Sequence, residues 1–142
     1  MKRPEEVRVE FTIQWVEKAE TDLNTAEYLC RSGGNYAYAA AFHAQQAAEK
    51  GLKAFLVWHQ IEFKKIHDIA ALLGLASSAE PDLRNVLRDA ESLTPYGVEY
   101  RYPGDYPQVT IDLAEHALSI AARVRDEIRE RLPWNTLSKE TR

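Results

Sequence analysis

The chain lacks the features that several classes of protein require. Its 142 residues include one cysteine, so no disulfide can form within the chain. Lys50 and Lys53 interrupt the only long apolar stretch, which therefore falls short of the roughly 18 to 20 apolar residues that cross a bilayer. The opening residues, MKRPEEVRVE, are charged where a secretory signal has an apolar core. We therefore expect a cytoplasmic protein without a membrane span.

Motifs for metals and for phosphate loops are also missing. A di-iron helical bundle needs a Glu three residues before a His. None of the four histidines meets this condition, because an Ala, two Leu and a Lys stand at those positions. No two histidines have a zinc-ligand spacing, and the six glycines are scattered through turns. The net charge of -4 gives no overall attraction to nucleic acid. We expect neither a metal nor a cofactor.

The residues that are present indicate an all-helical domain. Segments rich in Ala, Leu, Glu, Lys and Arg alternate with glycines and prolines. Their patterns predict helices over 12–31, 35–59, 67–75, 81–92 and 110–132. The stretch 93–108 holds three prolines and two glycines, so no helix is expected to run through it. We predict an antiparallel four-helix up-and-down bundle with an additional short helix. The domain would span 12–132, between a charged lead of 1–11 and a polar tail of 133–142.

The predicted helix over 35–59 is apolar on two sides. One side carries Tyr38, Ala41, Gln45, Ala48, Leu52, Leu56 and His59. The other side is mostly small, with Ala40, Ala47 and Ala54 among its members. A helix that is apolar on two sides is usually buried on two sides. Two explanations stay open: a central helix within one domain, or a helix that also contacts a second subunit.

Polar side chains stand among the alanines of the second side. They are His43, Gln46, Lys50 and Lys53, spaced one or two turns apart. Such a row of hydrogen-bond donors suits a phosphate or a nucleobase. A satisfied polar network at a helix contact is the alternative explanation of the same row.

Two further groups complete the set of eight candidate ligand-binding residues. His67 and Asp68 stand at the entry of the predicted short helix, where free backbone N–H groups favour anions. Arg101 and Tyr102 stand in a tyrosine-rich stretch, a combination that can hold a phosphate and stack a base. Either group could equally be a solvated loop.

Three ordered motifs together resemble a known family. FHAQQAAEKGLKAFL, then FKKIHDIAALL, then LTPYGVEYRYPGDYP before the last helix are very similar to the HEPN domain, and the likeness covers about 15–132. The resemblance implies a helical bundle that pairs as a homodimer and a link to nucleotides or RNA. Small prokaryotic members are commonly encoded beside a minimal nucleotidyltransferase, as toxin–antitoxin modules or as a split nucleotidyltransferase.

One motif of the catalytic family members is absent. Members that cleave RNA carry an Arg, four to six residues, and then a His, whereas no Arg stands five to seven residues before any histidine here. The resemblance thus implies a non-catalytic subunit that binds a nucleotide-like ligand and partners a separate nucleotidyltransferase. A toxin ribonuclease is the first alternative, with His43 or His67 as general acid–base and Lys50 or Arg101 stabilising the phosphorane. A helical adaptor without a ligand is the second.

Overall fold

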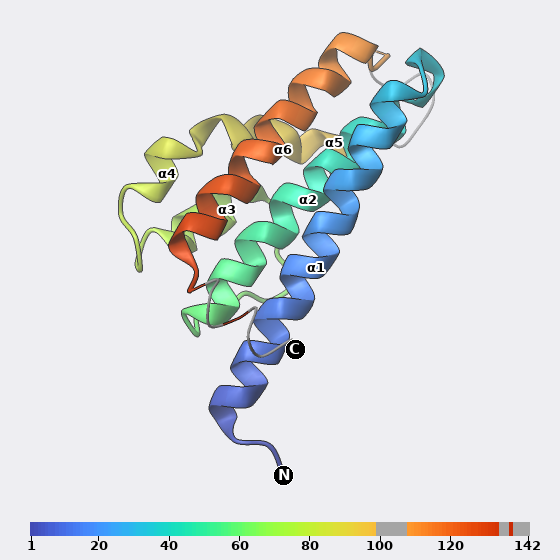
Figure 1. The fold of residues 1–142 in the computed structure, drawn as a ribbon. Coiled ribbons are helices and arrows are strands. Elements are labelled where there is room, and N and C mark those ends of the chain that lie inside the picture. The colour runs from blue at the N-terminus through green and yellow to red at the C-terminus, as the bar shows by residue number, and fades with distance from the viewer. Residues whose placement is uncertain (99–107, 134–136, 138–142) are drawn as a thin grey trace.

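The computed structural model describes residues 1–98, 108–133 and 137, and this part of the chain is helical without strands. The long helices are α1 (Pro4–Arg31), α2 (Ala37–Trp58) and α6 (Ile111–Arg131). The short ones are α3 (Ile69–Ala76), α4 (Leu83–Val86) and α5 (Thr94–Val98), with 3-10 helices η1 (Gly34–Tyr36) and η2 (Arg88–Leu93). The predicted all-α bundle is confirmed (Figure 1), although the helix predicted over 81–92 is broken into α4 and η2.

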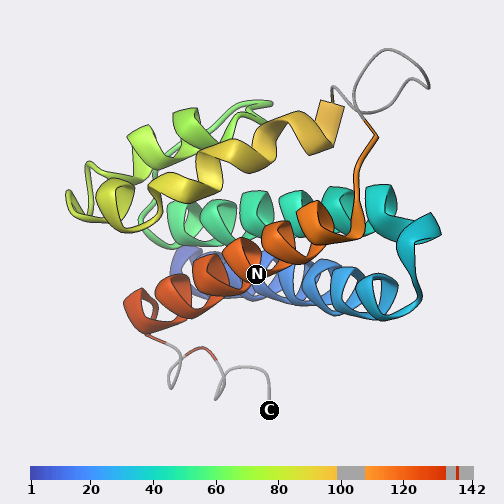
Figure 2. The same ribbon diagram turned by 90° about the horizontal axis from the view of Figure 1, so that it is seen from above.

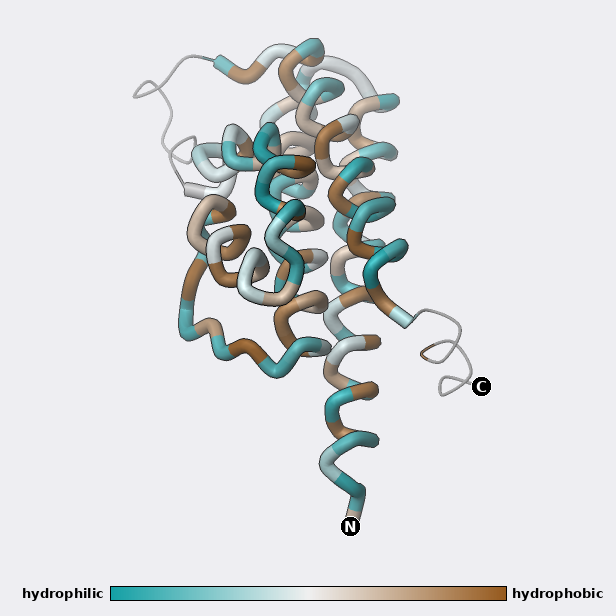
Figure 3. Tube along the Cα trace, turned by 90° about the vertical axis from the view of Figure 1, so that its left-hand side faces the viewer, coloured by the Kyte–Doolittle hydropathy of each residue, from teal (hydrophilic) through white to brown (hydrophobic). Residues whose placement is uncertain are grey.

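α1 begins well before residue 12, where the sequence predicted its start. Pro4 occupies the first helical turn, and Glu5 and Glu6 follow it, where carboxylates interact favourably with the helix dipole. The Glu6 carboxylate also accepts hydrogen bonds from the backbone N–H of Arg3 at 3.4 Å and from its Nε at 2.9 Å. The first turns extend beyond the rest of the bundle (Figure 3), so few tertiary contacts shape their apolar pattern. This explains why the charged start of the helix looks like a lead in the sequence.

α5 lies where the sequence predicted no helix. Pro95 stands in its first turn, where a missing backbone N–H costs no helical hydrogen bond. The prolines of 93–108 therefore permit one short helix at the beginning of that stretch. Arg101 and Tyr102, two of the predicted ligand-binding residues, lie outside the described residues.

α2 is the central helix of the chain. It contacts α1 and α6 on one side and α3 and α5 on the other (Figure 2). Ala40, Ala47 and Ala54 on its alanine-rich side are all buried within the single chain. Of the two explanations for a helix apolar on two sides, the central position therefore suffices. The homodimer stays a prediction that does not depend on this face.

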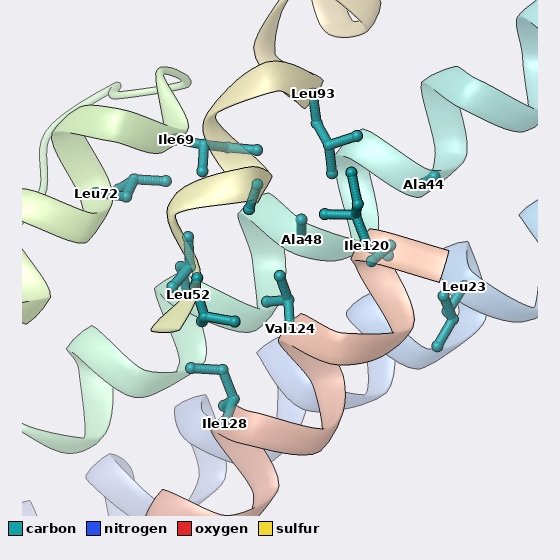
Figure 4. Close-up of a cluster of buried hydrophobic side chains, with 14 of the residues drawn as sticks. Leu23, Ala44, Ala48, Leu52, Ile69, Leu72, Leu93, Ile120, Val124 and Ile128 are labelled. Carbon is teal, nitrogen blue, oxygen red and sulfur yellow. The ribbon is translucent and has the colours of Figure 1, made fainter. Parts of the chain in front are cut away.

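The core forms around α2. Buried side chains from α1, α2, α3, η2 and α6 meet in one cluster (Figure 4), and Leu52, Phe55 and Leu56 of α2 are fully buried within it. Each such side chain contributes about 1.5–3 kcal/mol through its burial. α2, α3 and α6 begin and end within two residues of the predicted bounds.

The described residues also bear on the membrane and metal expectations. Within them, no helix combines the length and the apolar character needed to cross a bilayer. Nor does any group of three His, Cys, Asp or Glu side chains gather there that could hold a metal ion.

His59 ends α2 in an apolar setting. Its ring packs on Phe55, with 4.3 Å between the ring centroids, and its Nε2 is buried without a hydrogen-bond partner in the described part of the chain. Burial lowers the pKa of His59 below its ordinary value of 6.5; the charge of Glu80 opposes this shift and that of Arg8 adds to it. The folded chain therefore prefers the neutral imidazole.

This pKa shift predicts a pH dependence of stability. The unfolded chain binds the proton more readily, so the stabilising contribution of His59 is present above about pH 6.5 and is lost as the pH falls through the lowered pKa. Urea denaturation at successively lower pH, starting at about pH 6.5, measures this contribution. We expect the free energy of unfolding to fall less steeply with decreasing pH in His59→Leu than in the wild type. His116→Leu, on the exposed side of α6, should decline as the wild type does. An equally steep decline in His59→Leu would contradict the role given to this buried nitrogen.

Candidate functional site

His43 and Lys50 of α2 converge on one carboxylate of α1. His43 Nδ1 lies 2.9 Å from Asp22 Oδ1, and Lys50 Nζ donates to Asp22 Oδ2 at 2.5 Å. The Asp22 side chain is only 11% exposed, whereas the two side chains that it holds are partly open to solvent. We call these three residues the Asp22 cluster.

The geometry of the Asp22 cluster fixes where its donors are free. An ionised carboxylate oxygen only accepts, so the proton between His43 and Asp22 belongs to Nδ1, and Nε2 is the ring nitrogen that Asp22 does not engage. Carboxylates orient histidines in this way at many proton-transfer sites. The Lys50 ammonium has three donors and Asp22 takes one of them. Two donors of Lys50 therefore remain for an anion.

An open hollow of about 490 Å³ lies beside the Asp22 cluster. Its lining consists of Gln14, Glu17, Lys18, Thr21, Asp22 and Lys50. The first five share one face of α1, because they are spaced three and four residues apart or adjoin one another. The volume falls within the range of small-molecule sites. We call this space the α1 hollow; Lys50 forms its α2 side, and His43 contacts Asp22 without lining the hollow.

A second carboxylate gathers polar side chains on the other side of α2. Lys53 Nζ donates to Glu49 Oε2 at 3.1 Å, and His67 Nδ1 lies 3.2 Å from the same oxygen. Gln45 Nε2 donates to Glu49 Oε1 at 3.1 Å. The side chains of Glu49 and Lys53 are 5% and 7% exposed, whereas that of His67 is 63% exposed. We call these four residues the Glu49 cluster.

Aromatic rings enclose the ammonium of the Glu49 cluster. Lys53 Nζ lies 5.5 Å from the ring centroid of Trp15 and 5.6 Å from that of Phe63, within cation–π range. A methyl group on Gly97 of α5 would come within 2.8 Å of the Gln45 side chain, so glycine is what lets α5 pack onto this cluster. Burial, an ion pair and two rings favour a structural role for Lys53.

The structure therefore separates the row that the sequence placed on one side of α2. His43 and Lys50 belong to the Asp22 cluster, and Lys53 and His67 belong to the Glu49 cluster. Gln46 joins the second group, since its Nε2 donates at 2.6 Å to Gln45 Oε1. A ligand in the α1 hollow would contact Lys50 but none of the other three α2 residues of the row, which are absent from its lining.

Asp68 has a local structural role. It is the N-cap of α3, and its carboxylate accepts a hydrogen bond from the N–H of Ala70 at 3.0 Å. The N–H of Ile69 donates to Thr94 Oγ1 at 3.1 Å. Two of the backbone groups that were expected to favour an anion are thus already bonded.

The two carboxylates that organise these clusters were not among the residues predicted from the sequence. Asp22 is buried on α1 beside Leu23 and one turn before Ala26, where an ionised group needs a partner. Glu49 lies one turn from Gln45, a position already assigned to the core side. A search for charges at core-facing helical positions would have found both residues.

The family model described as "HEPN domain" matches residues 13–131. The chain belongs to the HEPN domain family. Both clusters of this HEPN domain lie within the matched residues, as does the whole lining of the α1 hollow.

Similar proteins agree with this assignment. The HEPN domain is 26% identical over 136 residues to "Putative toxin MJ1304" of Methanocaldococcus jannaschii, in a match that covers 86% of this chain and 88% of that protein. The crystal structure of ST0689, an archaeal HEPN homologue, matches with 28% identity and a TM-score of 0.66, over 92% of this chain and 98% of the other. That of TT1696 from Thermus thermophilus matches with 27% identity and a TM-score of 0.70, over 85% and 98%.

Proposed function

We propose that this chain is the HEPN subunit of a toxin–antitoxin module, that it binds a nucleotide-like ligand in the α1 hollow, and that it partners a separate minimal nucleotidyltransferase. The observation that carries the ligand part is the placement of Lys50 on a nearly buried carboxylate at the side of this hollow. The similarity to a protein named as a toxin supports the toxin–antitoxin part.

Phosphate binding would fall to the two lysines of the hollow. Lys50 is held by Asp22, which His43 fixes through its other oxygen, so the ammonium is positioned before a ligand arrives. Its two remaining donors, with those of Lys18, can make charge-assisted hydrogen bonds to phosphate oxygens. Nothing in this arrangement needs a chemical step, which agrees with the missing Arg and His pair of the RNA-cleaving members.

Calorimetric titration with a panel of nucleotides tests the ligand part. We expect saturable binding by the wild type and an affinity at least about tenfold lower in Lys50→Ala, because a hydrogen bond to a charged group contributes about 1.5–3 kcal/mol. Lys64→Ala removes an exposed lysine away from the hollow and should bind as the wild type does. Circular dichroism would confirm that both variants are folded. A wild type that gives no heat with any nucleotide would refute nucleotide binding.

The partner part has its own test. A minimal nucleotidyltransferase is recognised by Gly-Ser followed by paired aspartates, so an adjacent reading frame with this pattern is the expected partner. The two proteins should co-purify when expressed together with a tag on one of them. Separate elution of two folded proteins in gel filtration would argue against the partnership.

A ribonuclease toxin is the second candidate, because the Asp22 and His43 geometry favours it. An imidazole fixed through Nδ1 at 2.9 Å can exchange protons through Nε2, and Lys50 could stabilise a phosphorane. If the chain is such a toxin, its expression should arrest growth. Loss of this arrest in His43→Ala, but not in His116→Ala, would support ribonuclease activity over simple binding. Full arrest by His43→Ala would reject it.

A further inference from the structure

The α1 hollow carries equal numbers of charges of each sign. Lys18 and Lys50 contribute two ammonium groups, and Glu17 and Asp22 contribute two carboxylates. A free phosphate in this space would meet both signs, so it would gain little from the site as a whole. A matching ligand has to offer hydrogen-bond donors to the carboxylates as well as an anion to the lysines.

A ribonucleotide has both kinds of group. Its phosphate accepts from ammonium groups, and its ribose hydroxyls donate to carboxylates, as in dinucleotide sites where an acidic residue binds the 2′-hydroxyl. We infer that the α1 hollow selects ribonucleotides over deoxyribonucleotides and over inorganic phosphate. This inference rests on the proposed nucleotide-binding function and names the substrate class of the same site.

Glu17 is the carboxylate that would recognise the ribose. Asp22 is nearly buried and both of its oxygens already accept hydrogen bonds, from His43 and Lys50. The Glu17 side chain is exposed on α1, and no ion pair to it occurs in the described part of the chain. Its oxygens are therefore free to accept from a hydroxyl group.

The neighbouring residues fit the same assignment. Thr21 stands one turn after Glu17, and its hydroxyl donates at 3.0 Å to the Glu17 backbone oxygen, so Oγ1 is left mainly as a further acceptor. Gln14 stands one turn before Glu17 and offers a neutral amide. The described lining holds no aromatic ring, so we expect the hollow to distinguish sugars more strongly than bases.

Binding of adenosine monophosphate, its 2′-deoxy analogue and inorganic phosphate to the full chain, measured by calorimetry, tests the inference. We expect the ribonucleotide to bind roughly tenfold more tightly than the deoxyribonucleotide, and phosphate to bind most weakly. Uridine monophosphate should bind about as tightly as the adenosine compound. Glu17→Ala should bring the ratio of the two sugars close to one, whereas Glu130→Ala, on the exposed face of α6, should retain it.

The outcomes separate this inference from the function on which it rests. Equal affinity of the wild type for the two sugars would overturn sugar selection and leave nucleotide binding in place. A ratio that Glu17→Ala does not change would overturn the role of Glu17. Absence of binding by every nucleotide would overturn both the inference and the proposed ligand.

Discussion

Replacing Lys53 with Met is expected to lower the free energy of unfolding by about 3–5 kcal/mol, because it removes the buried ammonium that pairs with the buried Glu49 carboxylate. Glu49 and Lys53 are almost completely buried, with Nζ 3.1 Å from Oε2. Methionine keeps an apolar chain of similar length between Trp15 and Phe63, so the loss would arise from the charge rather than from a cavity. Urea denaturation followed by circular dichroism measures the difference.

Two further variants identify the cause of that loss. Lys64→Met removes an exposed ammonium eleven positions further on and should change stability by no more than about 0.5 kcal/mol. Adding Glu49→Gln to Lys53→Met should recover part of the loss, because a buried amide is less unfavourable than a buried charge. A loss below about 1 kcal/mol in Lys53→Met would mean that water reaches this ion pair. Lys53 would then return to the candidate ligand-binding residues.

The separation of the α2 row into two clusters could not be predicted from helical spacing. Lys50 and Lys53 are three residues apart and lie on neighbouring parts of the helix surface, which is what the sequence predicted. Their partners come from different places, since Asp22 belongs to α1 and Glu49 to α2 itself. Periodicity gives the direction of a side chain on its own helix, but the carboxylate that it meets depends on how the helices pack.

Local pattern was enough to predict α2 and α6, but not the break in the fourth helix. α2 and α6 follow a repeated apolar pattern with clear ends, such as the N-cap Thr110, whose Oγ1 accepts from the N–H of Leu113 at 3.2 Å. The broken fourth helix depends on distant contacts instead. Arg131 at the end of α6 forms ion pairs with Glu80 at 2.5 Å and Asp82 at 3.0 Å, just before α4. No local pattern contains such a contact between residues far apart in the chain.

Replacing Leu137 with Ala is expected to lower the free energy of unfolding by about 2–5 kcal/mol, the usual loss for a buried leucine. The sequence predicted a polar tail over 133–142, yet Leu137 is fully buried in the core cluster, and its N–H donates to the Pro133 oxygen at 3.0 Å. Leu113→Ala, at an exposed position of α6, is the matched control and should change stability by no more than about 0.5 kcal/mol. Equal small changes in both variants, measured by urea denaturation, would show that Leu137 does not stabilise the bundle. The expected difference would instead mean that the core of this chain extends past residue 131, where the match to the HEPN domain ends.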